Sequence, residues 1–186
     1  MLHATAITRF ARALGAARTG NLQAAKAEIA ELAKISAALR EAKDGYWPAI
    51  VDIQAQTATA WTQLAEGKKD EALQTMSAAA DAEDKTEKAP ITPGPLAPAR
   101  ELLGDMLLER GMAKEALQAF EQTLAKEPNR YRAFAGAAAA AVASADDTKA
   151  TTYYRKLANL ATQAVAAGLA VERPELIVAQ KYTAGK

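Results

Sequence analysis

One pattern of small and bulky apolar residues occurs four times along the chain, each time after a turn residue. In each copy an alanine follows the turn residue by five positions, and a bulky apolar residue follows that alanine by four. The turn residues are Gly20, Gly67, Gly111 and Ala145, the alanines are Ala25, Ala72, Ala116 and Ala150, and the bulky residues are Ile29, Met76, Phe120 and Tyr154. A spacing of four residues repeats one face of a helix, so each copy predicts a helix that begins after a turn.

A run of five alanines, Ala137–Ala141, lies in the last of these units. The last two copies are 34 residues apart at every step, and the same shift carries Gly104 onto Ala138. The alanine run therefore occupies the position where the neighbouring unit has glycine. Small residues there allow two antiparallel helices to approach closely, while Phe120 and Tyr154 fill the groove between units. We interpret the alanines as a packing surface.

These residues resemble the tetratricopeptide repeat (TPR) family. One unit, residues 97–130, matches the family pattern at Leu103, Gly104, Leu107, Ala116, Phe120 and Pro128, with Arg100 at the tryptophan position. The next unit, residues 131–164, matches at Phe134, Ala138, Ala150 and Tyr154 but lacks the closing proline. Two N-terminal units match mainly in their second helices. The resemblance implies an all-α, right-handed α-solenoid of about four helical hairpins, whose concave groove binds peptides or protein surfaces.

The pattern also predicts where the elements and their connections lie. We expect helices over residues 4–18, 22–43, 47–66, 69–83, 97–110, 113–126, 130–144 and 148–167. Residues 4–83 form an N-terminal pair of divergent hairpins, and residues 97–167 form two C-terminal units. Residues 84–96 form a loop rich in proline, because prolines at this density cannot continue a helix. Residues 168–186 form a C-terminal tail, in which a short helix can follow Pro174.

Composition narrows the classes of partner. Half of the 186 residues are hydrophobic but only 5% are aromatic, so alanine supplies much of the apolar content. The net charge of +1 gives no electrostatic basis for binding nucleic acid or an anionic membrane. No run of 18 or more apolar residues is present, so we expect no membrane span. The absence of cysteine excludes disulfides and thiol nucleophiles and fits a reducing compartment, so we expect a cytoplasmic protein.

Residues with catalytic potential are few, and we expect no enzyme activity, no cofactor and no metal site. His3 is the only histidine and lies near the terminus, with no companion ligand or base in reach by sequence. The nucleotide-binding and hydrolase motifs of glycine, serine and histidine are absent. Glu101 and Asp105, four residues apart, could act together as acid and base or line a solvated helix face. The N-terminal helix is rich in arginine, which fits either the first helix of the fold or a transit peptide.

The first helix of each hairpin would line the groove. This places Phe10, Leu14, Trp61, Leu64, Glu101, Asp105 and Arg132 on the groove surface as a peptide-binding site. Trp61 is either an aromatic anchor for a partner or, with Trp47, a core residue. The positions where some family members hold a C-terminal carboxylate carry no basic clamp.

The leading hypothesis is therefore a non-enzymatic scaffold that binds a protein or peptide partner. The alternative is a structural or oligomerisation segment of a longer repeat protein. The apolar stripe of Ile7, Phe10 and Leu14 could then be covered by an upstream repeat or by a second copy in a homodimer.

Overall fold

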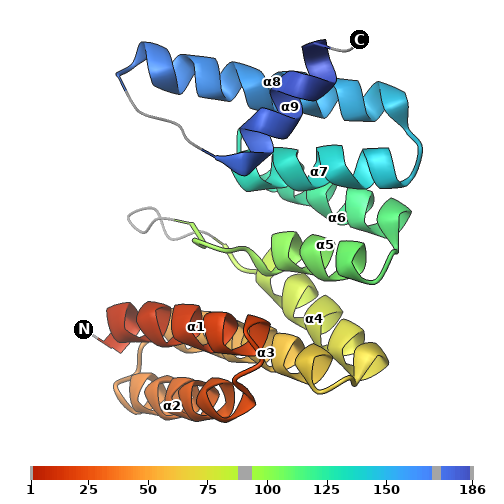
Figure 1. Ribbon diagram of the computed structural model, residues 1–186. Helices are drawn as coiled ribbons and strands as arrows, with labels where there is room; N and C mark the ends of the chain where they lie inside the picture. Colours follow the sequence, from red (N-terminus) through yellow and green to blue (C-terminus); the bar gives the residue numbers. More distant parts are fainter. Residues whose placement is uncertain (1, 88–93, 169–172, 185–186) are drawn as a thin grey trace. The chain divides into compact units, whose positions relative to one another are not determined.

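The computed structural model of the chain describes residues 2–87, 94–168 and 173–184, and every regular element among them is an α-helix (Figure 1). The described residues form α1 (Leu2–Arg18), α2 (Leu22–Glu41), α3 (Trp47–Ala65), α4 (Lys69–Asp84), α5 (Ala99–Glu109), α6 (Ala113–Lys126), α7 (Tyr131–Ala143), α8 (Asp147–Ala166) and α9 (Pro174–Ala184). The prediction of an all-α fold is confirmed.

The predicted helix ends agree with the observed ones to within two residues. The largest differences are at the start of α1, the end of α2 and the start of α5. The predicted proline-rich loop, residues 84–96, lies partly outside the described residues, because residues 88–93 are not described. A helix does follow the tail's proline, since α9 begins at Pro174.

The four predicted turn residues share one backbone conformation. The φ angles are 80° at Gly20, 82° at Gly67, 74° at Gly111 and 59° at Ala145. After each first helix, the turn residue donates to the carbonyl three residues earlier, at 2.9 to 3.2 Å. The next residue donates to the carbonyl five residues earlier, at 2.9 Å in all four turns. This double hydrogen bond is the Schellman motif, which ends a helix and favours glycine. The four sequence copies are therefore structurally equivalent turns.

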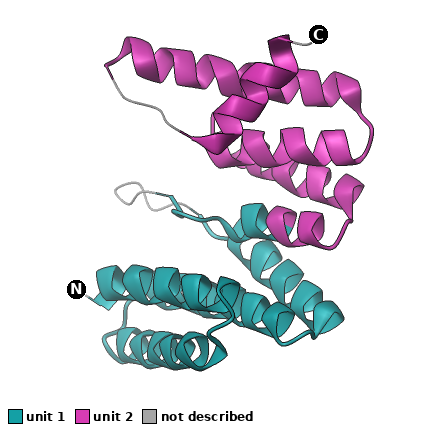
Figure 2. Ribbon diagram, in the orientation of Figure 1, with its two compact units in different colours: residues 1–103 teal, residues 104–186 magenta. Residues whose placement is uncertain are grey.

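The chain divides into two compact units, Met1–Leu103 and Gly104–Lys186, and the boundary lies inside α5 (Figure 2). In unit 1, α1 packs against α2 and α3, α2 packs against α3, and α3 packs against α4. The largest fully buried apolar side chains of this unit are Leu32, Met76 and Val51. Ala25 and Ala72, the small residues of the repeated pattern, are also completely buried.

In unit 2, Phe120 of α6 lies between two glycines on neighbouring helices. Its side chain is fully buried. A Cβ atom added at Gly104 in α5 would lie 2.7 Å from the Cζ of this ring, and one added at Gly136 in α7 would lie 2.3 Å from it. Real Cβ contacts are not this short. Sequence reasoning identified Gly104 and Phe120 but overlooked Gly136.

The alanine run lies in α7 and faces inward. Four of its five alanines have no exposed surface, and only Ala139 is exposed. Ala138 lies in a core cluster with Tyr154 and Leu157 of α8 and with Leu176 of α9. The expectation that the alanines form a packing surface is confirmed.

We predict that Gly136→Ala lowers the free energy of unfolding by about 1–3 kcal/mol, because the new methyl group overlaps the buried Phe120 ring. Gly15→Ala is the matched control. Gly15 is also helical, but it is exposed and has nothing within 4 Å of its added Cβ. Alanine should there stabilise the helix by about 0.5–1 kcal/mol. Urea unfolding followed by circular dichroism measures both, and stabilisation by both substitutions would contradict the proposed overlap.

We also predict that Ala145→Gly stabilises the protein by about 1 kcal/mol, because a non-glycine residue is strained at positive φ. The reciprocal change, Gly111→Ala at the equivalent turn, should destabilise by a similar amount. The same urea titration compares the two variants, and a loss of stability in Ala145→Gly would show that the Ala145 methyl group has a favourable contact.

Candidate functional site

An apolar pocket with a cavity volume of about 110 Å³ lies within unit 1. Its walls come from α1, the start of α3, the end of α4 and residues 94–97. The apolar lining residues are Ile7, Phe10, Tyr46, Trp47, Ile50, Ile53, Pro95, Leu96 and Ala97, and the others are Gln54, Thr57, Glu83, Thr86 and Gly94. Glu83 is the only charged residue among these described lining residues. A pocket of this composition can accept an apolar group.

The aromatic wall of the pocket is set by the way α3 begins. The backbone N–H groups of Tyr46 and Trp47 donate to Oδ1 of Asp44, at 2.9 and 2.8 Å. These bonds, from Trp47 first and then Tyr46, lower the pKa of the Asp44 carboxyl below its ordinary value. The Trp47 ring is stacked on His3 of α1, with centroids 4.8 Å apart, and Tyr46 meets it edge-on at 5.3 Å. The Trp47 ring is therefore held between His3 and Tyr46.

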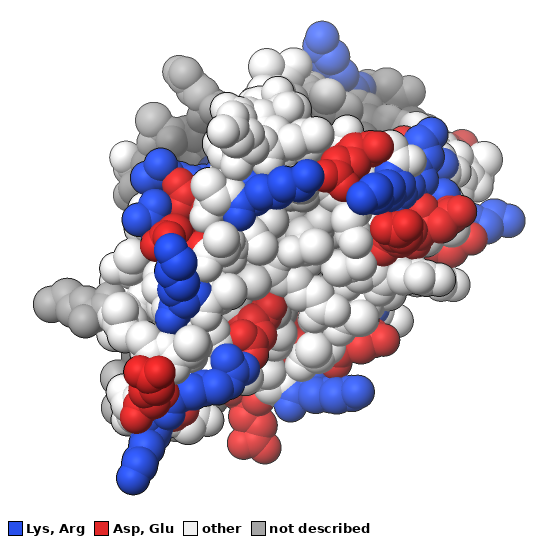
Figure 3. Space-filling view, turned by 90° about the horizontal axis from the view of Figure 1, so that it is seen from below, with Lys and Arg blue, Asp and Glu red and all other residues white. Residues whose placement is uncertain are grey.

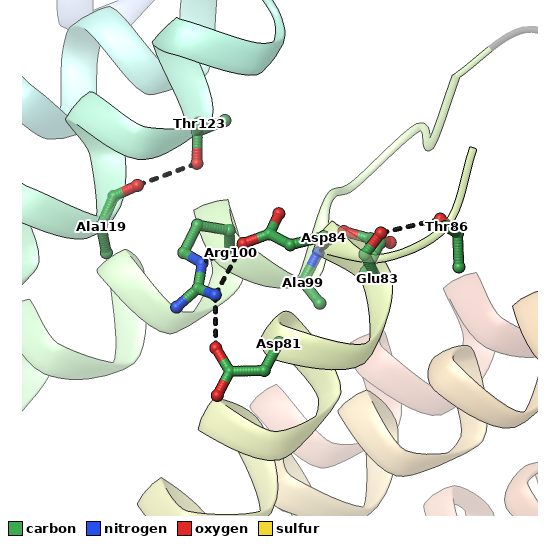
Figure 4. A network of polar contacts seen from close by, with 8 residues as sticks. All are labelled: Asp81, Glu83, Asp84, Thr86, Ala99, Arg100, Ala119 and Thr123. Atoms are coloured by element: carbon green, nitrogen blue, oxygen red, sulfur yellow. Dashed lines mark hydrogen bonds and ion pairs between the residues drawn. The ribbon is translucent and has the colours of Figure 1, made fainter. Parts of the chain in front are cut away.

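A different set of bonds holds the wall formed by residues 94–97. The Arg100 guanidinium at the start of α5 donates to Asp81 and Asp84 at the end of α4, at 2.6 Å to each (Figure 4). The backbone N–H of Ala99 donates to Oε2 of Glu83, also at 2.6 Å. Burial lowers the pKa of Arg100, but the bonds to Asp81 and Asp84 outweigh it, so the pKa is raised. These bonds fix the chain directly after residues 94–97, at the edge of the pocket.

Gln54 is a polar residue in the wall of this apolar pocket. Its side chain lines the pocket, and its Oε1 is buried without a hydrogen-bond partner among the described residues. A buried acceptor that has lost water and gained no donor costs about 1–3 kcal/mol. Oε1 of Gln54 is therefore an unpaired acceptor among the described residues, enclosed in the wall of the pocket and not open to it.

The predicted groove residues of unit 1 differ in their surroundings. Phe10 lines the pocket and is 7% exposed. Trp61 is 3% exposed, and the Arg18 guanidinium lies 4.5 Å from the centroid of its ring. Leu14 and Leu64 are half-buried. Glu101 has no exposed surface.

The other two predicted groove residues lie in unit 2. Asp105 of α5 and Arg132 of α7 form an ion pair with an N–O distance of 3.0 Å. Arg132 is exposed, and its guanidinium is engaged by this carboxylate. One groove formed by all seven predicted residues stays a prediction, and three of the seven, Phe10, Trp61 and Glu101, are buried.

Sequence reasoning did not select Ile50, Gln54 or residues 94–97. A signal for two of them was present, because Ile50, Gln54, Thr57 and Trp61 follow one another at helical spacing. Extending the Trp61 face of the helix by about three turns toward Trp47 would have found Gln54 and Ile50. Nothing in the local sequence pattern indicates that residues 94–97 line the same pocket as residues of α3.

The surface charge is mixed on the face that Figure 3 displays, where basic and acidic side chains are interspersed. No described helix has the length and apolar character needed to cross a membrane. Within the described ranges, no group of three or more histidine, aspartate or glutamate side chains could hold a metal ion.

Comparison with solved structures reveals a likeness in fold. No protein-family model and no curated protein matches the sequence. A crystal structure of nearly identical TPR-like repeats, from a Podosopora anserina putative kinesin light chain, superposes with a TM-score of 0.61. The match covers 95% of this chain and 82% of that chain. The chain has a TPR-like repeat fold.

The prediction of TPR-like hairpins packed in sequence is thereby confirmed. At 19% sequence identity the likeness establishes the fold alone. The TPR-like fold places α1 and α3 as the first helices of two successive hairpins, and the pocket lies where these two helices present their side chains.

Proposed function

We propose that this TPR-like chain is a non-enzymatic interaction module that holds a peptide or protein segment on the surface formed by α1 and α3. The observation that carries this proposal is the apolar pocket between these helices, closed on one side by residues 94–97. Solenoid repeats generally use the first helices of their hairpins as an extended binding surface. The predicted groove residues Leu14 and Leu64 would extend the contact along the same two helices.

The position of the single histidine, the surface charge and the absence of cysteine support the other parts of the proposal. His3, the only histidine, is stacked on Trp47, where it supports the pocket wall. The near-neutral charge and its mixed distribution favour a protein partner over nucleic acid or an anionic membrane. A chain without cysteine is suited to a reducing compartment, and we therefore propose that the protein acts in the cytoplasm.

A photo-crosslinking residue tests where the partner lies. We predict that p-benzoylphenylalanine at Leu14, half-buried on α1, forms a covalent adduct with a protein from the native source. The same residue at Ala33, exposed on α2, should form none. Gel electrophoresis and mass spectrometry identify the adducts. Identical adducts at both positions, or none at Leu14, would contradict binding on the α1 surface.

A second candidate function is end-to-end association with another repeat segment or a second copy of the chain. It is favoured by large aliphatic side chains near the C-terminal end of the described residues. Val165 of α8 is 59% exposed, and Ile177 and Val178 of α9 are 55% and 49% exposed. Large exposed apolar side chains on two helices that pack against each other in a repeat array are typical of a stacking surface.

If association is the main function, we predict that light scattering at micromolar concentration reports a dimer or larger species. Val178→Lys should then return the chain to a monomer, because it places a charge in the apolar contact. A wild-type chain that stays monomeric as its concentration is raised would remove this second candidate.

A further inference from the structure

A second cleft lies within unit 2, where α6 and α8 each pack against α7. It consists of two adjoining hollows of about 240 and 360 Å³, which share Asn129, Phe134 and Lys156 as lining residues. The smaller hollow continues along α8, and the larger continues along the C-terminal half of α6. The cleft has no lining residue in common with the pocket of unit 1.

Lys156 of α8 brings a positive charge to both hollows. Its side chain is exposed, and its Nζ lies 5.6 Å from the ring centroid of Phe134 and 6.0 Å from that of Tyr153. Both rings line the cleft, so the ammonium group is held at the cleft by its attraction to their faces. No carboxylate among the described residues pairs with Lys156. The ammonium group is therefore positioned and accessible to an anion from outside the chain.

Glu121 of α6 also lines the larger hollow, but its carboxylate is already engaged. Its Oε1 accepts a hydrogen bond from the Tyr153 hydroxyl at 2.7 Å and forms an ion pair with Lys149 at 2.8 Å. The hydrogen bond to Glu121 is the main cause that raises the pKa of Lys149, so this lysine stays charged at neutral pH. Lys149 thus balances Glu121, and the charge of Lys156 remains unbalanced.

A carboxylate is the anion that matches this charge. A carboxylate carries one negative charge, whereas a phosphate monoester carries nearly two and a nucleic acid requires a row of cations. The other polar lining residues of the smaller hollow are Asn129, Asn159 and Gln163, all of them exposed. Each side-chain amide can donate hydrogen bonds to a carboxylate.

The larger hollow is suited to an aliphatic group. Its wall along α6 and the following turn contains Leu124, Ala125 and Pro128. Because the two hollows adjoin each other at Lys156, a ligand that fills both presents a carboxylate and an aliphatic group side by side. Neighbouring side chains of a protein segment provide this combination.

We propose that this cleft binds an acidic segment of a partner protein. A carboxylate of aspartate or glutamate pairs with Lys156 in the smaller hollow, and an aliphatic side chain beside it packs against α6 in the larger one. This site is additional to the surface formed by α1 and α3 and does not depend on the function proposed there.

The experiment uses the full 186-residue chain and a phage library of random dodecapeptides. The library is first depleted on Lys156→Gln and then selected on the wild-type chain. Selected peptides should share an aspartate or glutamate next to leucine, isoleucine or valine. One such peptide, labelled with fluorescein, is the probe in anisotropy titrations. Replacing its acidic residue by the corresponding amide should weaken binding about tenfold, because a charge-assisted bond is lost.

Two pairs of variants locate the binding. Lys156→Gln should weaken binding about tenfold, whereas Arg155→Gln removes the same charge from the adjacent exposed position outside the cleft and should leave affinity within twofold. Ala125→Glu adds a carboxylate to the cleft and should weaken binding more than tenfold. Its control is Gln122→Glu, which makes the same change of charge at an exposed position of α6 outside the cleft and should alter affinity less than twofold.

Three results would overturn the proposal: no peptide enriched on the wild-type chain, enriched peptides without an acidic residue, or equal losses in Lys156→Gln and Arg155→Gln. Should Lys156→Gln lose its helical circular dichroism, selection is repeated with depletion on Ala125→Glu, and the Ala125 and Gln122 pair decides. Crosslinking at Leu14 reports on the α1 surface independently, so either site can fail while the other stands.

Discussion

The close approach of helix backbones at alanine and glycine positions is the constraint on which this structure depends. Alanine buries little apolar area, so helices rich in it gain stabilisation only if their axes come near enough for a few large side chains to touch several helices at once. Phe120 shows this in unit 2, where one fully buried ring meets backbone at Gly104 and at Gly136. The glycines provide the space and the ring supplies the contact area, so neither is useful without the other.

The turns between the helices also serve this close approach of helix backbones. Each hairpin reverses within a few residues because the residue after its first helix adopts a positive φ angle, and in three of the four equivalent turns that residue is glycine. A tight turn brings the second helix back against the first at once, where the small residues Ala25, Ala72, Ala116 and Ala150 meet it. All four of these alanines are completely buried. Turn conformation and small residues thus act together to specify the hairpin.

The shared turns and small residues explain why the helices could be predicted from the sequence and the pocket could not. The repeated pattern records what the units share, namely turns, small residues and one bulky residue, and these fixed the helix ends to within two residues. The pocket depends on what the units do not share. Residues 94–97 line the same pocket as Ile50 and Gln54, although they lie 40 or more positions away in the sequence. The bonds of Arg100 and Ala99 to the end of α4, which hold the chain beside residues 94–97, are encoded by no local pattern. Gly136 was overlooked for a similar reason, since shifting Gly104 by one repeat leads to its equivalent, Ala138, and not to Gly136, which contacts Phe120 from the same helix.

The helix that lines the pocket is also the one that breaks the usual rule for buried polar groups. Among the described residues, the buried side-chain nitrogen and oxygen atoms without a hydrogen-bond partner are those of Gln54, Trp61 and Gln63, and all three lie on α3. Arg18 lies over the face of the Trp61 ring, and the Nε1 donor in the plane of that ring has no hydrogen-bond partner among the described residues. A helix that served packing alone would favour apolar residues at such positions, because each unsatisfied group costs about 1–3 kcal/mol. Native proteins tend to break local rules of this kind at functional sites. The concentration of such groups on one helix therefore separates α3 from the other described helices and supports the binding surface that we propose there, although only Gln54 is among the residues that line the pocket.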